Sequence, residues 1–539
     1  MHTASNAYAY PLLIRHLLTT AMVTAADKEI VTSDIHRYTY KDFNTRLAKL
    51  AAGLRCHGIK HGDTVAVMDW DGHRYLEGFF GVPMMGAILH TINIMLSPQQ
   101  ILYTINHAKD DVILVHQDFV PMIEQIIDHI EHPVKLILLT DENVTPDLPA
   151  GFVTDYESML HQAEEGYLFE DFDESTIATT FYTTGTTGDP KGVYYSHRQI
   201  VVHTLGTIAG LCTGSENIRI HKDDVYMPVT PMFHVHAWGF PYIVTMLGLK
   251  QVYPGRYVPA RILKLIETEG ATYSHCVPTI LQMLLSAPEA QSTDLSKLKI
   301  VIGGSALPRG LAKAAMDKGI QVYTGYGMSE TCPVLTLSDI SAVDTLGATE
   351  ESLTARCKTG KPIPLVDLRV VDESMQDVPR DGRTTGEVVV RSPWLAQGYS
   401  RNPQGSEELW KDGYLHTGDV GFLDSEGSLQ ITDRMKDVIK SGGEWISSLS
   451  LESIASSCDG VSEVAAIGVA DERWGERPIL LVVTSKEIKA EQILDAFKAQ
   501  VDSGLLTKWA MPDRVEFVDA LEKTSVGKLD KKALRLRYG

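Results

Sequence analysis

Residues 177–192 read IATTFYTTGTTGDPKG and decide the fold expected for this chain. The first six residues are mostly β-branched or aromatic, which is typical of a buried strand. The last ten contain three glycines, four threonines and Lys191. Glycines let a backbone approach a ligand closely, while hydroxyl groups and a lysine add donors and positive charge. A strand followed by such a loop predicts an α/β protein that holds a polyphosphate at a strand end.

Two other interpretations of residues 183–192 are weaker. The loop does not fit the G-x-x-x-x-G-K-[S/T] pattern of a Walker A loop. A surface turn rich in glycine and threonine is the bland alternative, and it would fit a shorter string better than this ten-residue one.

Apolar runs and helical patterns alternate through the first 340 residues. The segments 64–68, 111–115 and 134–139 are short, apolar and largely β-branched, so they predict buried strands. Residues 40–58 have the spacing of an amphipathic helix. A second set of such segments begins near Thr176. This alternation favours an α/β architecture with largely parallel sheets.

The sequence changes character after about residue 345. Short strands lie closer together, with Gly and Pro between them, which predicts a small antiparallel or barrel-like unit. A charged link, DRMKD, follows at 433–437, and the last hundred residues predict a separate α+β domain. The expected organisation is an N-terminal domain over 1–432, with α/β subdomains at about 1–175 and 176–340 and a barrel-like part at about 341–432, the link at 433–437, and a C-terminal domain over 438–539.

Composition excludes several classes of protein. The net charge of −20 over 539 residues argues against a dedicated nucleic-acid binder, which needs a basic surface. No apolar run reaches the ~18–20 residues that span a bilayer, and the N-terminus lacks the pattern of a signal peptide. The six cysteines form no CxxC pair, so neither a zinc site nor a disulfide framework is indicated. A cytoplasmic protein is expected.

The loop at 183–192 resembles the signature loop of the adenylate-forming superfamily, which includes acyl-CoA synthetases, firefly luciferase and peptide-synthetase adenylation domains. Further segments resemble the same superfamily in the same order along nearly the whole chain. They are GYGMSET at 325–331, TGD at 417–419, DRMKD at 433–437, SGGEWI at 441–446 and KTSVGKLDK at 523–531. The resemblance implies a large N-terminal domain and a mobile C-terminal domain that acts as a lid.

This resemblance implies ATP and Mg²⁺ as ligands. An aromatic face at Tyr326 suits adenine, Asp419 suits the ribose hydroxyls, and a carboxylate at Glu330, together with Thr186, suits a hard divalent cation. Ser329 stands where the superfamily usually has Thr, and its hydroxyl is kept. The implied nucleotide-binding residues are Thr183, Thr184, Gly185, Thr186, Thr187, Lys191, Gly304, Gly325, Tyr326, Gly327, Ser329, Asp419, Arg434 and Lys440.

Two lysines and one glycine-rich segment are implied to carry the chemistry, alongside Glu330. Lys528 matches the catalytic lysine, whose ammonium stabilises charge that develops at the α-phosphate. Lys436 falls at the hinge position. A solvated lysine and a simple Gly-Gly turn are the alternatives for these features. The residues implied for coenzyme A and thioester formation are Lys440, Gly442, Gly443, Glu444 and Trp445.

The segment PMFHVHAWG at 231–239 contains two histidines. They have i, i+2 spacing, as two metal ligands on a strand would, but no further ligand accompanies them. The resemblance implies instead that His234 borders the acid pocket, while His236 is either part of that border or a core histidine. The implied acyl-pocket residues are His234, Val235, Trp238, Gly303 and Pro333. Cys332 has no paired base, so a nucleophilic role is disfavoured.

The segments 231–242, 358–366 and 433–447 resemble fatty-acid–CoA ligases most, and residues 6–18 resemble bacterial ligases for short and medium acids. The expected activity joins a carboxylic acid to coenzyme A through an acyl-adenylate, with 3-methylmercaptopropionate as the specific expectation and a homodimer as the expected assembly. A medium- or long-chain fatty-acid–CoA ligase and an adenylation module for a carrier protein stay open. A nucleotide-binding regulator and a luciferase-like oxygenase stay open as well.

Overall fold

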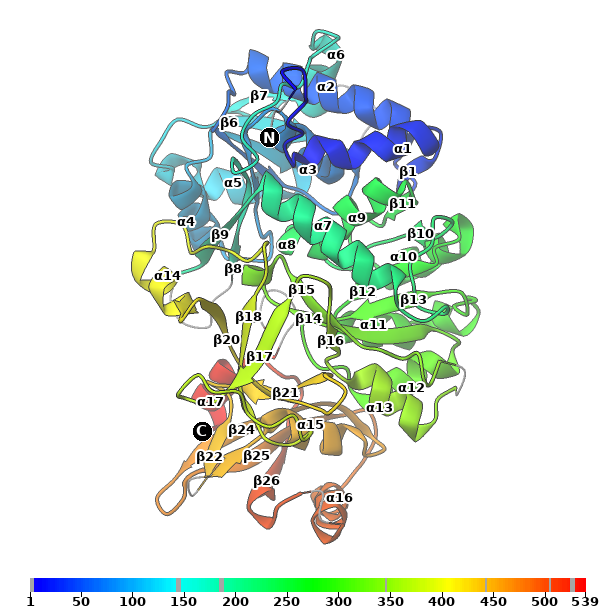
Figure 1. Cartoon of the computed structure of the whole chain (residues 1–539), viewed down its shortest axis with the longest axis vertical. Helices are drawn as coiled ribbons and strands as arrows, with labels where there is room; N and C mark the ends of the chain where they lie inside the picture. Colours follow the sequence, from blue (N-terminus) through cyan, green and yellow to red (C-terminus); the bar gives the residue numbers. More distant parts are fainter. Residues whose placement is uncertain are drawn as a thin grey trace.

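The computed structural model describes residues 4–141, 147–183, 189–344, 347–441, 444–503, 506–523 and 529–539; of residues 444 and 445 only the backbone is described. Figure 1 shows a large part that contains the N-terminus and a smaller part that contains the C-terminus. Within these described ranges, sheets of nine, seven, five and five strands form the frame. The architecture is α/β, as the sequence predicts.

The seven-stranded sheet has the order β7-β6-β5-β3-β4-β8-β9. Its strands are β3 (Thr64–Met68), β4 (Ile88–Thr91), β5 (Val112–His116), β6 (Lys135–Leu139), β7 (Phe152–Asp155), β8 (Ile177–Thr183) and β9 (Lys191–Ser196). All its pairings are parallel except that of β8 with β9. Every residue of β3 and β5 is buried, which explains why their sequences are continuous apolar runs.

The nine-stranded sheet has the order β16-β15-β14-β13-β12-β10-β11-β1-β2. Its strands are β1 (Glu29–Thr32), β2 (His36–Thr39), β10 (Val225–Tyr226), β11 (Lys250–Tyr253), β12 (Tyr273–Cys276), β13 (Lys299–Ile302), β14 (Gln321–Gly327), β15 (Val334–Leu337) and β16 (Lys361–Pro362). Its centre is parallel, and β2, β15 and β16 add antiparallel pairs.

The two large sheets exchange strands, so the expected subdomain boundary at residue 175 does not follow them. β1 and β2 come early in the chain but extend the nine-stranded sheet, where β1 pairs in parallel with β11. β8 and β9 follow residue 175 but complete the seven-stranded sheet. Pairing between strands so far apart in sequence leaves no local signal in the residues themselves.

The helices of the N-terminal part lie around its sheets (Figure 1). They are α1 (Thr19–Thr24), α2 (Tyr40–Cys56), α3 (His73–Met84), α4 (Pro98–Ala108), α5 (Val120–Ile126), α6 (Tyr156–Gln162), α7 (His197–Cys212), α8 (Val235–Trp238), α9 (Phe240–Leu247), α10 (Pro259–Glu269), α11 (Pro278–Ser286), α12 (Arg309–Asp317), α13 (Glu350–Cys357) and α14 (Pro403–Leu409). The predicted helix at 40–58 is α2, and a capping box between Thr39 and Asp42 fixes its start.

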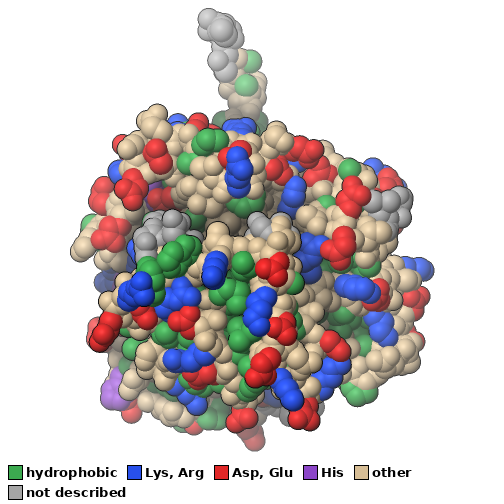
Figure 2. Space-filling view, turned by 90° about the horizontal axis from the view of Figure 1, so that it is seen from below, with side chains coloured by type: hydrophobic (Ala, Val, Ile, Leu, Met, Phe, Trp, Pro, Cys, Tyr) green, Lys and Arg blue, Asp and Glu red, His purple; other side chains and the backbone are tan. Residues whose placement is uncertain are grey.

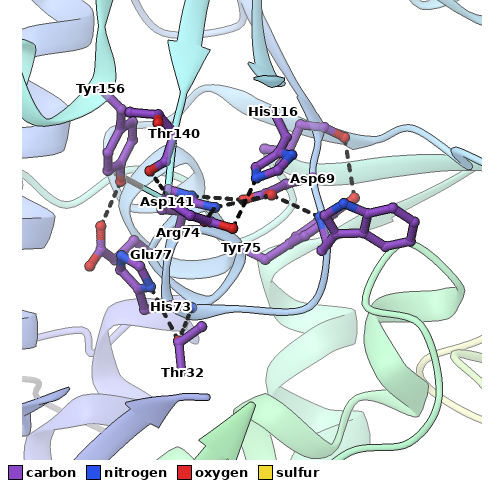
Figure 3. Close-up of polar contacts among 12 residues, drawn as sticks. Thr32, Asp69, His73, Arg74, Tyr75, Glu77, His116, Thr140, Asp141 and Tyr156 are labelled. Carbon is purple, nitrogen blue, oxygen red and sulfur yellow. Dashed lines mark hydrogen bonds and ion pairs between the residues drawn. The ribbon is translucent and has the colours of Figure 1, made fainter. Parts of the chain in front are cut away.

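A buried polar network at the start of α3 links the two large sheets (Figure 3). The Arg74 guanidinium is 2.9 Å from the Asp69 carboxylate and 2.8 Å from that of Asp141, which follows β6. The backbone N–H of His73 donates to the hydroxyl of Thr32, on β1, at 2.9 Å. Because buried charges require such partners, this cluster fixes how the sheets meet.

The third sheet is antiparallel and the fourth sheet belongs to the C-terminal part. The third contains β17 (Asp367–Val371), β18 (Gly386–Arg391), β19 (Trp410–Lys411), β20 (Tyr414–Leu423) and β21 (Leu429–Arg434). The fourth contains β22 (Ile439–Ser441), β23 (Glu444–Ile446), β24 (Val461–Asp471), β25 (Gly475–Thr484) and β26 (Arg514–Phe517), with helices α15 (Ser448–Ser456), α16 (Ala490–Asp502) and α17 (Lys531–Tyr538). The chain passes from one sheet to the other between β21 and β22.

Contacts on both sides of this crossing hold the C-terminal part in place. The Asp433 carboxylate accepts from the backbone N–H of Ser448 at 2.6 Å. The Asp437 carboxylate pairs with Arg535 at 3.0 Å. The face of the C-terminal part in Figure 2 carries acidic and basic side chains intermixed. Over the described residues, no helix has the length and apolar character needed to cross a membrane.

Candidate active site

One cavity of about 1620 Å³ lies between the N-terminal sheets and the C-terminal part. It brings together residues from segments far apart in the sequence. The predicted site residues that line it are Thr183, Lys191, His234, Val235, Trp238, Gly303, Gly304, Gly325, Tyr326, Gly327, Ser329, Glu330, Pro333, Asp419, Arg434 and Lys436. Lys440 lies on β22 and is not among the lining residues.

Several predicted residues lie outside the described part of the chain. They are Thr184, Gly185, Thr186, Thr187, Gly442, Gly443 and Lys528, together with the side chains of Glu444 and Trp445. The described residues on either side of 524–528 are Lys523 and Leu529. Both line the cavity and form an isolated antiparallel bridge with each other.

Three predicted nucleotide-binding residues form one contact on the wall of the cavity. Tyr326, at the end of β14, donates from its hydroxyl to the Asp419 carboxylate at 2.7 Å. Arg434 lies opposite Asp419 in the β20–β21 pair, with its Nε 3.3 Å from the other carboxylate oxygen. Burial raises the pKa of Tyr326, so this phenol stays protonated and donates. The carboxylate of Asp419 raises the pKa of Arg434.

Two glycines let backbone and rings approach closely beside this contact. A Cβ on Gly327 would lie 1.8 Å from the carbonyl oxygen of Pro333. A Cβ on Gly303 would lie 3.0 Å from the ring of Trp238 and 3.0 Å from the carbonyl oxygen of Gly325. The nucleotide side and the apolar side of the cavity therefore meet at positions that only glycine fits.

Tyr399 is a site residue that the sequence analysis missed. Its hydroxyl donates to Oε1 of Glu330 at 2.6 Å, and the Lys191 ammonium lies 4.6 Å from the centre of its ring. Glu330 is 7% exposed and faces the cavity. The only local signal was a Gly-Tyr-Ser string in a loop after β18, which is too common to single out. The contact depends on three segments that fold together.

The predicted acyl side is built on a turn of unusual handedness. All four residues of α8 have positive φ, from 46° at Val235 to 58° at Trp238. Left-handed geometry costs non-glycine residues roughly 1–2 kcal/mol each, so tertiary contacts must hold the turn. His236 supplies one, because its Nε2 lies 2.6 Å from the hydroxyl of Thr179 on β8.

The interpretation of His234 and His236 as a metal-binding pair on a strand is wrong. The segment is a left-handed turn, not a strand. His236 is a buried histidine whose pKa is lowered to about 3 by burial. Among the described residues, no group of three or more His, Cys, Asp or Glu side chains is arranged to hold a metal. His234 remains at the cavity wall.

Aromatic side chains line the apolar side of the cavity. Trp238 and Phe240 line it, while the rings behind them do not. The His275 ring stacks on Phe240 with centres 4.4 Å apart, and its Nε2 is 2.8 Å from the hydroxyl of Tyr226. Phe240, His275 and Tyr226 are fully buried. Buried rings therefore lie behind the aromatic lining of the cavity at Phe240.

The surroundings of Cys332 and of the basic side chains of α17 give these residues a structural role. Cys332 is buried, and burial raises the pKa of its thiol, which opposes a nucleophilic role. In α17, the Lys531 ammonium lies 2.6 Å from the Glu452 carboxylate, and Arg537 lies 2.5 Å from Glu522. These charges are paired within the C-terminal part.

Comparison with known proteins shows the family of this chain. The family described as AMP-binding enzyme matches residues 18–400, and its C-terminal domain matches 450–528. A long-chain-fatty-acid–CoA ligase of Thermus thermophilus is 40% identical, covering 95% of this chain and 93% of that one. A 3-methylmercaptopropionyl-CoA ligase of Ruegeria pomeroyi is 37% identical, covering 91% and 90%.

A solved structure shares the whole fold. The anthranilate CoA ligase AuaEII, crystallised with anthranoyl-AMP, superposes with a TM-score of 0.85 at 23% identity, covering 99% of each chain. The chain therefore belongs to the AMP-binding enzyme family, as an acid–thiol ligase of the AMP-forming class.

Proposed function

We propose that this enzyme joins a short-to-medium-chain carboxylic acid to coenzyme A, at the expense of ATP, through an acyl-adenylate. The products are the acyl-CoA thioester, AMP and pyrophosphate. One observation carries the proposal: the polar contact of Tyr326, Asp419 and Arg434 and the apolar wall at Trp238 face the same cavity. A nucleotide on the first and an acid on the second would meet beside Gly303.

In the first step, a carboxylate oxygen of the acid attacks the α-phosphorus of ATP and pyrophosphate leaves. Tyr326 provides an aromatic face for adenine, and Asp419 accepts from the ribose hydroxyls. The ammonium of Lys528 stabilises the charge that builds on the phosphate oxygens. The loop at 183–192 holds the phosphates.

The carboxylate of Glu330 on the cavity wall fits a magnesium ion. Glu330 is a largely buried carboxylate that faces the cavity, and Mg²⁺ is commonly held by one or two carboxylates together with substrate phosphates. Glu330 and the hydroxyl of Thr186 would hold the ion. When bound, it neutralises phosphate charge.

In the second step, the thiol of coenzyme A attacks the acyl carbonyl and AMP leaves. We propose that the C-terminal domain, 438–539, first turns about Lys436 and brings Lys440 to Trp445 to the cavity. The contact between Asp433 and Ser448 spans Lys436 and must break during this turn. Asp437 and Arg535 both lie C-terminal to Lys436, so their ion pair stays intact during the turn.

We propose a short or medium acid because two bulky aromatic side chains, Trp238 and Phe240, line the apolar side of the cavity, and fully buried rings lie behind them. The named relatives do not decide the acid, because one acts on long-chain fatty acids and the other on 3-methylmercaptopropionate. We propose 3-methylmercaptopropionate as the specific substrate. A long-chain acid is the second candidate, on the strength of the 40% identical relative.

We also propose that the enzyme is a cytoplasmic homodimer, with the N-terminal domain over 1–432 and the hinge at 433–437. Light scattering of the full chain tests the assembly.

Pyrophosphate exchange into ATP tests the activity directly. The full chain should catalyse exchange with acid present and without coenzyme A, and adding coenzyme A should convert acid to thioester with one AMP per thioester. Exchange with acid but no use of coenzyme A would favour a carrier-loading module. Absence of exchange with every acid would contradict the proposal and favour a nucleotide-binding regulator.

A further inference from the structure

A loop at 395–400 joins the strand after the phosphate-binding loop to the turn that carries Glu330. On one side, the backbone N–H of Ser400 donates to the carbonyl of Gly192, on β9, at 2.8 Å. On the other side, the backbone N–H of Ala396 donates to the carbonyl of Glu330 at 2.9 Å. The loop therefore adds a second connection between two segments that also meet directly, where the Tyr195 hydroxyl on β9 donates to the carbonyl of Ser329 at 2.6 Å.

Tyr399 occupies the middle of this bridge and contacts a functional side chain on each side. Its backbone forms an antiparallel bridge with Val193. Its hydroxyl donates to Oε1 of Glu330 at 2.6 Å, and the Lys191 ammonium lies 4.6 Å from its ring centre. One side chain thus contacts the proposed metal-binding carboxylate and a proposed phosphate-binding cation.

We infer that Tyr399 is a positioning residue that orients Glu330 for the metal of Mg·ATP and holds Lys191 beside the phosphates. The inference rests on the proposed function, which assigns the metal to Glu330. It adds a residue outside the segments from which that site was inferred, and it divides the role of one tyrosine between its hydroxyl and its ring.

The hydroxyl acts on the carboxylate of Glu330. A hydrogen bond to Oε1 fixes the rotation of the carboxylate plane, so that Oε2 has a defined direction for a cation. Hydrogen bonds to metal-binding side chains commonly change metal affinity by ~10–100-fold. Loss of this bond should therefore weaken the effect of magnesium more than the binding of the nucleotide itself.

The ring acts on the ammonium of Lys191. A cation within about 6 Å of an aromatic centre is attracted by the negative face of the ring. This contact limits the conformations of a long side chain that otherwise loses entropy when it meets a phosphate. Loss of the ring should therefore weaken nucleotide binding even when no metal is present.

Two variants separate these roles. Tyr399→Phe removes the hydroxyl and keeps the ring, while Tyr399→Leu removes both. Tyr414→Phe is the matched control, because Tyr414 donates to the Asp367 carboxylate at 2.9 Å and has an arginine over its ring, but does not line the cavity.

Calorimetric titration of the full chain with ATP, once with EDTA and once with excess Mg²⁺, tests the inference. In Tyr399→Phe, the gain in affinity from Mg²⁺ should fall about tenfold, while the metal-free Kd stays within about twofold of wild type. In Tyr399→Leu, the metal-free Kd should also rise several-fold. The Tyr414→Phe control should match wild type in both titrations.

Other results would overturn the inference. An unchanged gain from Mg²⁺ in Tyr399→Phe would show that the hydroxyl does not orient Glu330. Equal losses with and without Mg²⁺ in both variants would show a merely structural tyrosine. A wild-type chain that binds no ATP in either titration would overturn the proposed function, and this inference with it.

Discussion

The nucleotide side and the acyl side of the cavity are built in different ways. The nucleotide side consists of polar residues from separate segments that hydrogen-bond to each other, such as Tyr326 with Asp419 and Tyr399 with Glu330. The acyl side consists of apolar and aromatic side chains around a left-handed turn, with buried histidines that burial keeps neutral. Charges and hydrogen bonds govern the first side, and shape governs the second.

This difference explains what the sequence predicts well. Phosphate, ribose and magnesium require particular side chains and glycines. The segments that bind them therefore contain recognisable sequence motifs. An acid pocket requires only a volume, and many combinations of side chains enclose the same volume. Substitutions on the two sides should therefore change different measured quantities.

The largest effect is expected at Lys528, to which the proposed function assigns the stabilisation of phosphate charge. Lys528→Ala should lower acid-dependent pyrophosphate exchange by roughly 100–1000-fold, because it removes charge stabilisation in the transition state. Thioester formation from a supplied acyl-adenylate should be largely spared. Rapid-quench assays of each half-reaction measure this. Lys498→Ala, in an exposed position on α16, is the control. Equal loss in both half-reactions would refute the role of Lys528.

The next effect is expected at Asp419, which is 3% exposed and accepts from Tyr326. Asp419→Ala should raise the Kd for ATP by roughly 10–100-fold, because hydrogen bonds to charged groups contribute ~1.5–3 kcal/mol. The relative preference among acids should not change. Calorimetry and an acid panel measure the two quantities. A changed acid preference with normal ATP affinity would reverse the proposed division between the sides.

A smaller effect is expected at Phe240, on the acyl side. Phe240→Leu should enlarge the apolar side of the cavity and raise kcat/KM for octanoate relative to propionate by about tenfold, since one methylene changes specificity by ~10–200-fold. The Kd for ATP should stay at the wild-type value. An unchanged ratio of the two kcat/KM values would show that the acid does not reach Phe240.

The last effect concerns stability rather than catalysis. Burial lowers the pKa of His236 to about 3 in the folded chain, while the unfolded chain takes up that proton below about pH 6.5. The free energy of unfolding should therefore fall as the pH decreases from 6.5 toward 3, by up to ~1.4 kcal/mol per pH unit for this group.

Urea unfolding at several pH values measures this slope. Asparagine tolerates left-handed geometry, so His236→Asn should still fold. It should lower the slope of the unfolding free energy against pH by the contribution of one proton. His161→Asn, in an exposed position, should leave this slope unchanged. An identical slope in both variants would show that His236 does not carry the linkage.

Local chemistry and long-range packing divide what the sequence could predict. The strand at 64–68, the helix at 40–58 and the closely spaced short strands after residue 345 depend on local patterns, and the structure has these elements. The motifs around Tyr326 and Asp419 could also be recognised in the sequence, and the structure places both residues at one cavity.

The rest depends on contacts between distant segments. The pairing of β1 with β11, the bond between Tyr399 and Glu330, and the ring of His275 behind Phe240 each join residues far apart in the chain. The handedness of the turn at 235–238 likewise depends on the bond from His236 to Thr179. No pattern within a single segment reports such contacts.

The most direct test of the central claim is AMP and thioester formation by the full chain across acids from propionate to palmitate, including 3-methylmercaptopropionate. The claim is that nucleotide and acid meet in one cavity whose apolar side is lined by Trp238 and Phe240. It predicts equal amounts of AMP and acyl-CoA, formed only when ATP, acid and coenzyme A are all present, with the highest kcat/KM for a short or medium acid. A clear optimum above twelve carbons, or ATP cleavage that does not depend on the acid, would contradict it.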